Sequence, residues 1–189
     1  MHAPLQRLKQ RAFTLVELLI VVIILAILAA IIIPQFTSAT VDAQESALDA
    51  NLTGLRSAIE LYHAQHGVLY PGAAASSGGT CAAGAATGSG AANTAQAFMD
   101  SLLMYSDAAG TTCSVADATH RFGPYIRRGV PADPITGKGA LIAEVVVTST
   151  GAALAPAAAT GGWAYDTKSG QIVMNSNAND SKAKAYSTH

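Results

Sequence analysis

The most strongly patterned stretch of the chain is an apolar run of 21 residues, Phe13–Ile33. Every residue from Leu18 to Ile33 is apolar, and Glu17 is the one ionisable residue of the run. At about 1.5 Å of rise per residue, a helix of this length extends roughly 30 Å, which matches the hydrocarbon core of a bilayer. The pattern therefore predicts a transmembrane helix near the N-terminus.

The residues that precede this run predict its orientation. Residues 1–12 contain Arg7, Lys9 and Arg11 and no acidic residue. Because basic residues that flank a transmembrane segment tend to stay on the cytoplasmic side, we expect the N-terminus to be cytoplasmic. The chain after Ile33 is then extracytoplasmic.

An ordinary secretory signal peptide is the first alternative, and the sequence argues against it. Such a signal ends in small residues after a shorter apolar core, whereas this run ends in Ile33 and Pro34, and its small residue, Ala12, stands before it. The basic leader, Ala12, the sequence FTLVE from Phe13 to Glu17, and the apolar run up to Pro34 together resemble the N-terminal signature of type IV pilins and of the pseudopilins of type II secretion.

This resemblance implies a processing step and an assembly step. A membrane-embedded prepilin peptidase would cut between Ala12 and Phe13 on the cytoplasmic side and then N-methylate Phe13. The family usually has Gly before the cut, so Ala12 departs from the pattern. Processed subunits would then form a helical homopolymer with the help of inner-membrane pilus or secretion assembly machinery.

Glu17 is the candidate assembly residue. A carboxylate inside hydrocarbon is costly unless it is paired, so an intramembrane acid suggests a function. Its candidate partner is the α-amino group that cleavage creates at Phe13, in the same or a neighbouring subunit, and the resemblance favours the neighbour. The alternative is that Glu17, close to the start of the span, extends to the cytoplasmic interface as a snorkelling side chain.

The helix is predicted to continue beyond the membrane. Pro34 removes one backbone donor and should kink or loosen the helix without necessarily ending it. Apolar residues then recur at helical spacing and form an apolar stripe: Val41, Leu48, Leu52, Leu55, Ile59 and Tyr62. Charged residues are expected on the other faces: Asp42, Glu45, Asp49, Arg56 and Glu60. We therefore expect one helix from Phe13 to His66, with Gly67 as its stop.

The next part of the chain predicts loops around one short helix. Pro71–Asn93 consists mostly of Gly, Ala, Ser and Thr, which is typical of a loop. Thr94–Tyr105 has a helical apolar period. Phe122–Gly137 contains three prolines and three glycines, which forbid sustained helix or central strand. It also resembles a connection in many major-pseudopilin-like sequences.

The last third predicts a small sheet. Ala140–Thr148 is rich in β-branched residues and reads as a strand, and Gly151–Gly162 is an Ala/Gly linker. Trp163–Asp166 and Gln171–Asn175 flank a turn and predict a hairpin. Its alternating face should pack on the amphipathic half of the long helix, which gives an α+β fold of the type IV pilin kind with a small antiparallel sheet. We expect residues 176–189 to be a frayed polar tail.

The two cysteines predict a disulfide. In an extracytoplasmic compartment Cys81 and Cys113 most simply bond to each other. Closing that loop would stabilise the fold by about 3–4 kcal/mol in the chain-entropy model. Free thiols are the alternative, and a metal site is a poor rival because two isolated thiols lack the ligand count of a zinc centre.

Enzymatic and nucleic-acid readings find little support. His63 and His66 lie three residues apart and could share a metal, but no third ligand is evident, and solvated helix histidines are the commoner explanation. Phosphate-loop and nucleophile-elbow patterns are absent. Arg127 and Arg128 could touch DNA, although the chain without its leader has eight basic and twelve acidic residues, which argues against a general nucleic-acid surface.

Calcium is the one cofactor left open. Major pseudopilins of type II secretion often carry it in their C-terminal loops, and this chain has oxygen-bearing residues there: Asp166, Asn175, Asn177 and Asp180. Their spacing matches no defined loop, and turn-forming residues explain them equally well. We assign no metal ligands.

The sequence thus predicts four parts: a leader peptide at 1–12, a transmembrane and filament-core helix at 13–33, its amphipathic continuation at 34–67, and an extracytoplasmic globular head at 68–189. The predicted function is that of a non-catalytic filament subunit of the inner membrane, later found in a periplasmic or cell-surface filament. The turn segment and the hairpin slightly favour a type II secretion pseudopilin over a surface pilin. The alternative is a signal-anchored periplasmic binding or enzymatic domain.

Overall fold

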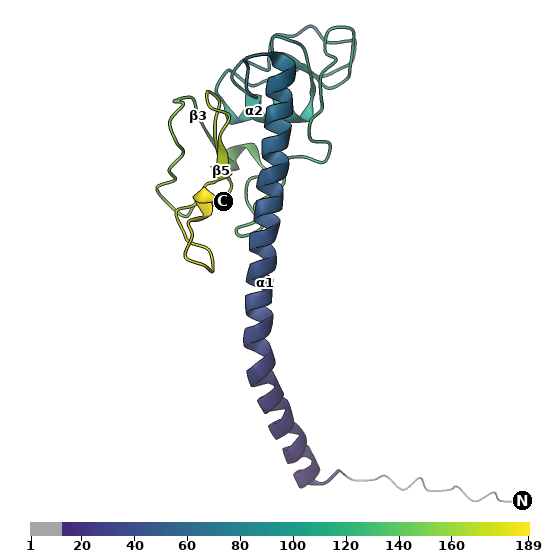
Figure 1. Cartoon of the computed structure of the whole chain (residues 1–189). Helices are drawn as coiled ribbons and strands as arrows, with labels where there is room; N and C mark the ends of the chain where they lie inside the picture. The colour runs from purple at the N-terminus through teal and green to yellow at the C-terminus, as the bar shows by residue number, and fades with distance from the viewer. Residues whose placement is uncertain (1–12) are drawn as a thin grey trace, which may run out of the picture. The chain divides into compact units, whose positions relative to one another are not determined.

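The computed structural model describes residues 13–189. The basic leader and the predicted cleavage residue Ala12 lie outside the described residues. The chain divides into two compact units, an N-terminal unit that ends at Val41 and a C-terminal unit, Asp42–His189. Helix α1, Leu15–His66, contributes residues to both (Figure 1). This confirms the long helix that the sequence predicts.

In the N-terminal unit, none of the described residues covers the apolar part of α1. Its large apolar side chains are exposed on every face of the helix, from Leu15 at 81% to Ile32 at 44%. Within the described residues, α1 is the one helix long and apolar enough to cross a membrane. The helix continues through position 34, as Pro34 was expected to allow. Thr37 and Thr40 then donate their hydroxyls to the carbonyls four residues earlier.

In the C-terminal unit, one face of α1 is buried as the periodicity predicts. The residues of the apolar stripe in this unit are at most 1% exposed: Leu48, Leu52, Leu55, Ile59 and Tyr62. The helix ends at His66, and Gly67 adopts a left-handed φ of 77°. That conformation is strained for a residue with a Cβ atom but not for glycine, so Gly67 ends the helix as expected.

Helix α2, Ala95–Leu103, is shorter than the prediction of Thr94–Tyr105. Thr94 is its N-cap and accepts a hydrogen bond from the Ala97 amide. Tyr105 instead begins strand β1, Tyr105–Ser106, which pairs antiparallel with β2, Thr112–Cys113. The helix stops because the backbone of Ser106 exchanges two hydrogen bonds with Phe122, an extended pairing that a helical period does not reveal.

The predicted hairpin is confirmed. Strand β4, Trp163–Asp166, pairs antiparallel with β5, Ile172–Met174, and Gly170 in the turn has a φ of 70°. The alternating side chains on its inner face are at most 1% exposed: Trp163, Tyr165, Ile172 and Met174. They share one hydrophobic core with the apolar stripe of α1 and with Phe98 and Leu102 of α2. Figure 1 shows β5 beside the C-terminal part of α1.

Strand β3 differs from the prediction in two respects. It spans only Val145–Thr148, because Ile142–Glu144 form a short 3-10 helix, η1. The Glu144 carboxylate accepts hydrogen bonds from the amides of Gly139 and Leu141, which turns the chain there. β3 also runs parallel to β4, so the three-stranded sheet is mixed rather than antiparallel. A parallel pair needs a long crossover connection, and the Ala/Gly linker provides it.

The C-terminal segment is ordered, so the prediction of a frayed tail was wrong. It ends in a second 3-10 helix, η2, Tyr186–Thr188, and Tyr186 is buried. Glu45, which the sequence places outside the apolar stripe, is also buried, at 6% exposed. Its carboxylate accepts hydrogen bonds of 2.7 Å from both the amide and the hydroxyl of Ser181. A buried carboxylate requires such donors, and the tail supplies them.

Replacing Leu55 by Ala tests this packing. Leu55 is 1% exposed and lies at the centre of the apolar stripe, so the cavity should lower the free energy of unfolding by about 2–4 kcal/mol. Urea denaturation of the full chain in detergent, followed by the fluorescence of Trp163, would measure the change. Leu61→Ala is the matched control: Leu61 is 51% exposed on the same helix, and its loss should cost less than about 1 kcal/mol. Equal losses for the two variants would contradict the packing.

Candidate functional site

The start of α1 is held by a reciprocal pair of side chains, Thr14 and Glu17. The amide of Thr14 donates to Oε2 of Glu17 at 2.9 Å, and the Thr14 hydroxyl donates to the same oxygen at 2.8 Å. The Glu17 amide donates back to Oγ1 of Thr14 at 3.2 Å. Thr14 therefore occupies the N-cap position of α1 and Glu17 the third helical position, which is a capping box.

This arrangement gives Glu17 a role that the sequence reasoning missed. A Thr three residues before a Glu, just ahead of an apolar run, is the signal of a capping box, and the sequence TLVE carries it. A carboxylate in the first turn also interacts favourably with the helix dipole. Thr14 is thus a further candidate site residue, because it fixes where the Glu17 carboxylate lies.

The capping box leaves part of the Glu17 carboxylate free. All of its hydrogen bonds among residues 13–189 use Oε2, and the side chain is exposed. Phe13, whose backbone nitrogen would become the amine on cleavage, is 77% exposed. Glu17 can therefore cap its own helix and still offer Oε1 to a cation from outside the subunit.

The predicted disulfide between Cys81 and Cys113 is present. Their Cα atoms lie 5.7 Å apart, and the bond closes a loop of 32 residues in sequence separation. Cys113 is fully buried in β2, and Cys81 is partly exposed in the Gly/Ala-rich loop. The bond joins this loop, which has few apolar side chains to bury, to the β1–β2 pair.

The two histidines near the end of α1 have different partners and form no common site. His63 stacks on Tyr70 with 4.0 Å between the ring centroids, and His66 stacks on Tyr62 at 3.8 Å. His66 is only 7% exposed, so the expectation of a solvated histidine is wrong at this position. The ring is buried because β1 and the Phe122 side chain pack over the end of the helix.

The hydrogen bonds of His66 determine which of its ring nitrogens carries the proton in the neutral form. Nδ1 lies 2.9 Å from the carbonyl of Tyr62 and must donate to it, since a carbonyl only accepts. Nε2, 3.1 Å from the Ser106 hydroxyl, then accepts in the neutral tautomer. Burial lowers the pKa of His66, and this outweighs the opposing influence of the Tyr62 carbonyl and of Asp107.

The two carboxylates considered as oxygen donors for calcium accept hydrogen bonds from the loops around them. Asp166 accepts hydrogen bonds from the hydroxyl of Thr148 and from the amides of Thr150 and Ser169. Burial opposes its ionisation, but these bonds hold the pKa of Asp166 well below its ordinary value. Asp180 accepts from the amides of Lys182 and Lys184.

The two asparagines also act within the loops. The Asn177 side chain donates a hydrogen bond to the Ala157 carbonyl. The backbone N–H of Asn175 donates to the Gly162 carbonyl. Calcium binding stays a prediction without assigned ligands.

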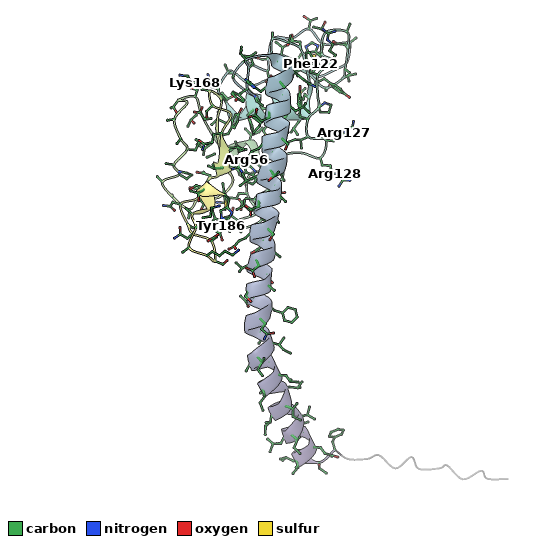
Figure 2. The ribbon with its side chains drawn as sticks, in the orientation of Figure 1. Arg56, Phe122, Arg127, Arg128, Lys168 and Tyr186 are labelled. Atoms are coloured by element: carbon green, nitrogen blue, oxygen red, sulfur yellow. A yellow bond between two sulfur atoms is a disulfide. The ribbon has the colours of Figure 1, made fainter. Side chains whose placement is uncertain are left out.

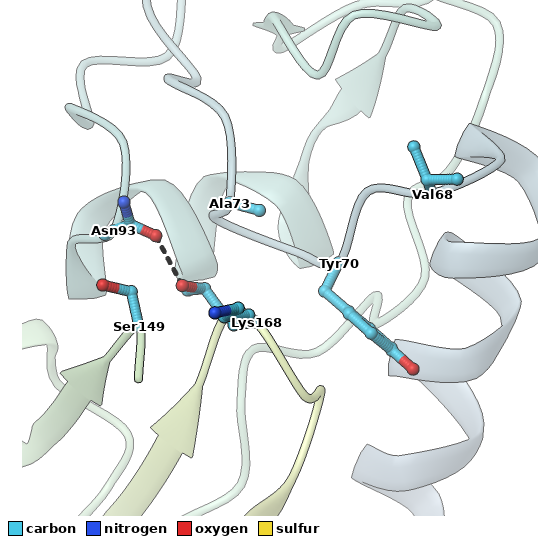
Figure 3. A pocket seen from close by; sticks show the side chains of 7 residues that line it. Val68, Tyr70, Ala73, Asn93, Ser149 and Lys168 are labelled. Carbon is cyan, nitrogen blue, oxygen red and sulfur yellow. Dashed lines mark hydrogen bonds between the residues drawn. The ribbon is translucent and has the colours of Figure 1, made fainter. Parts of the chain in front are cut away.

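Figure 3 shows an open pocket of about 350 Å³ in the C-terminal unit. Its lining includes Tyr70, Asn93, Ser149 and Lys168, and a hydrogen bond joins Thr167 to Asn93 across it. The lining contains the hydroxyls of Tyr70, Ser149 and Thr167 and one ammonium group, that of Lys168.

Arg127 and Arg128 lie on the turn-rich connection. Both side chains are exposed, and Figure 2 shows them pointing away from the ribbon. Among residues 13–189, neither guanidinium forms an ion pair. Arg127 and Arg128 are thus solvated side chains of a loop.

Comparison with known proteins supports the N-terminal resemblance. Residues 7–33 match the family model of the prokaryotic N-terminal methylation motif. The chain is 36% identical over 58 residues to the type II secretion system core protein G of Pseudomonas aeruginosa, a match that covers 31% of this chain and 41% of that protein. It is 41% identical over 59 residues to the type IV major pilin protein PilE of Neisseria gonorrhoeae, covering 31% of this chain and 35% of that protein.

The chain thus spans less than half the length of either of these relatives. No solved structure matches it. The prepilin-type signature at residues 7–33 is confirmed. The similarity to a type II secretion core protein and to a type IV pilin extends over about 31% of the chain.

Replacing Thr14 by Ala tests the capping box. The variant loses both hydroxyl bonds to Glu17, so the first turn of α1 should fray, at a cost of about 0.5–2 kcal/mol in local stability. Hydrogen exchange measured by NMR in micelles should then show faster exchange at the amides of Glu17 and Leu18, which donate to the hydroxyl and the carbonyl of Thr14. Thr14→Ser keeps the hydroxyl and should exchange like the wild type. Unchanged exchange in the Ala variant would argue against the cap.

His66 predicts a pH dependence of stability. Its pKa is lower in the folded than in the unfolded chain, so the unfolded chain binds the proton first as pH falls. The stability that burial of the neutral His66 ring allows should be complete above the unfolded pKa of about 6.5. The free energy of unfolding should then decrease as pH falls below that value. Urea titrations between about pH 7.5 and 5.5 should show this slope in the wild type and a flatter profile in His66→Gln. The carboxylates with lowered pKa values titrate below this window. An equal slope in both proteins would sink the assignment.

Proposed function

We propose that this chain is a structural, non-catalytic subunit of a type IV pilus-like filament. The observation that carries the proposal is the apolar part of α1 in the N-terminal unit. It is apolar on every face, is interrupted by one acidic residue and is left exposed by residues 13–189. Such a helix requires lipid or the helices of other subunits around it. The similarity to a pilin and to a type II secretion core protein supports the second environment as the final one.

The proposed maturation starts in the inner membrane with residues 1–12 in the cytoplasm. Prepilin peptidase removes this leader between Ala12 and Phe13 and methylates the new amine of Phe13. The match of residues 7–33 to the methylation motif supports this step. Removal of the leader also takes away Arg7, Lys9 and Arg11, the basic residues that favour a fixed position at the cytoplasmic face.

Assembly then pairs Glu17 of one subunit with the Phe13 amine of a neighbour. The capping box supports this pairing, because it holds the carboxylate at the helix start and leaves Oε1 available. Two opposite charges in a low-dielectric environment attract strongly, and an unpaired one is costly. The pair would therefore stabilise one axial register of neighbouring helices. An apolar surface without a charge would allow many registers.

Transfer from the membrane to the filament needs little free energy in this scheme. Lipid tails and apolar side chains are similar solvents, so contacts between helices replace contacts with lipid at small net cost. Residues 13–33 would form the filament core, and residues 68–189 would form its surface. Residues 34–67, the amphipathic continuation of the helix, would connect the two. Between the two filament classes, the turn segment Phe122–Gly137 and the β4–β5 hairpin slightly favour a type II secretion pseudopilin.

The competing proposal is a periplasmic binding or enzymatic domain held by a signal anchor, in which Glu17 is incidental. The pocket of Figure 3 is the feature that would serve such a domain. The two proposals differ in what they require of Glu17, because an anchor needs only hydrophobicity.

Replacing Glu17 by Leu separates them. The filament proposal predicts normal membrane insertion but at least a tenfold loss of the chain from filaments sheared off cells or released as periplasmic polymer. Intact mass of the wild-type chain in each fraction should show a product that begins at methylated Phe13. Abundance in the sheared fraction indicates a surface pilus, and confinement to the membrane fraction with cleavage indicates a pseudopilus.

Glu60→Leu is the control, since Glu60 is an exposed acid of the C-terminal unit on the same helix. Its assembly should match the wild type. An uncleaved chain that starts at Met1, or normal assembly of the Glu17 variant, would reject the filament proposal in favour of the anchored domain.

A further inference from the structure

Two polar residues gather beside the disulfide. The sulfur of Cys113, a carboxylate oxygen of Asp117 and a ring nitrogen of His120 all lie within 4.8 Å of one another. Cys81 belongs to the same cluster because its sulfur is bonded to that of Cys113. The cluster thus holds two sulfurs, one imidazole and one carboxylate, and these are the donor types that structural zinc sites use.

The imidazole and the carboxylate already have the spacing of ligands that share a metal. Nδ1 of His120 lies 3.0 Å from Oδ2 and 3.1 Å from Oδ1 of Asp117. With zinc bonds of about 2.0–2.1 Å, two ligand atoms at a tetrahedral angle lie about 3.3 Å apart. A zinc ion could replace the proton between these groups if they moved by only a few tenths of an ångström.

The other ring nitrogen of His120 has the supporting partner that a metal ligand needs. Nε2 lies 3.2 Å from the Thr111 hydroxyl, and that hydroxyl donates at 2.8 Å to the Asp107 carboxylate. With Nδ1 on a metal, Nε2 would carry the proton and donate to Thr111. Histidine ligands commonly have such a second hydrogen bond, which fixes the tautomer and orients the ring.

Burial and access also suit a metal site. His120 is 1% exposed and Cys113 is fully buried, so two donors are held rigidly in the fold. The Asp117 side chain is 21% exposed and Cys81 is partly exposed, so the cluster opens to solvent on their side. Cys81 lies in the Gly/Ala-rich loop, which can shift to separate the two sulfurs to the distance of about 3.8 Å that two thiolates on one zinc ion require.

We propose that the chain binds Zn²⁺ through Cys81, Cys113, Asp117 and His120 when the disulfide is reduced. A dithiol supplies the two electrons and two protons of that reduction and itself becomes a disulfide. The two thiols formed then lose their protons as the metal binds. Zinc and the disulfide exclude each other, because both use the same sulfurs. This site goes beyond the filament proposal and does not depend on it.

Cobalt is the direct probe, because Co²⁺ enters zinc sites and reports its ligands by absorption. The full chain in detergent, reduced and kept free of oxygen, should bind one Co²⁺ with thiolate-to-metal charge-transfer bands and the strong visible bands of tetrahedral coordination. Zn²⁺ should displace it. The oxidised chain should give neither band, and Zn²⁺ should raise the melting temperature of the reduced chain only.

Variants of the non-sulfur ligands decide whether the site is built as proposed. His120→Ala and Asp117→Asn should each weaken zinc binding by about 100-fold, and Thr111→Ala by about tenfold through the loss of support to the ring. His63→Ala is the matched control, a partly buried histidine of the same unit, and should bind like the wild type. The near-ultraviolet circular dichroism of each oxidised variant would verify its fold.

Two results would overturn the proposal. One is a reduced wild-type chain that shows no charge-transfer band with Co²⁺. The other is wild-type affinity and spectrum in Asp117→Asn, which would mean that the thiols bind metal without the carboxylate. Asp117 lies in an exposed turn, so its conservative variant provides this second result even if His120→Ala does not fold.

Discussion

A long helix that is apolar on all sides at one end and along one stripe at the other must be covered in two different ways. Along Asp42–His66 the chain covers the stripe itself, with α2 and the inner face of the sheet. Along Leu15–Ile33 no other described residue covers the helix, so the large apolar side chains there are exposed. The free energy of burying apolar surface, about 25 cal/mol per Å², makes this difference the main determinant of both the fold and the proposed function.

The C-terminal unit achieves its order with little regular secondary structure, and buried carboxylates provide much of the connection between its loops. Asp133 accepts hydrogen bonds from the amides of Thr136 and of Gly162, which is distant in sequence. Asp100 accepts from the hydroxyl of Ser76 and the amide of Gly90. Each of these aspartates is at most 8% exposed. In segments rich in Gly and Ala, where few side chains can pack, such bonds replace apolar contacts in defining the path of the chain.

The same logic connects the two ends of α1 to function. At its N-terminus, Thr14 holds the Glu17 carboxylate in place and leaves one oxygen without a hydrogen bond from residues 13–189. Near its C-terminal end, aromatic rings and Ser106 enclose His66 and keep its ring neutral. The first arrangement leaves a carboxylate oxygen exposed, as the proposed assembly requires. The second favours the neutral form of a buried ring.

The features that the sequence by itself determined are those in which the signal is local and periodic. The membrane-length helix, its stop at Gly67, the apolar stripe, and the β4–β5 hairpin all follow from spacing and turn chemistry within short windows. The disulfide followed from the number of cysteines and the expected compartment. The capping box also has a local signal, the residues TLVE, in which a Thr precedes a Glu by three positions.

The tertiary structure alone decided the features that join distant residues. Glu45 and Ser181 are far apart in sequence, so no local pattern could show that the tail covers a carboxylate on α1. The parallel direction of β3 depended on the path of the linker, and the end of α2 on pairing with Phe122. The ligand count beside Cys113 is the clearest case. The sequence offered two thiols, and only the folding of residues 114–120 back onto β2 placed Asp117 and His120 beside Cys113, because the proposed coordination depends on distances in space rather than along the chain.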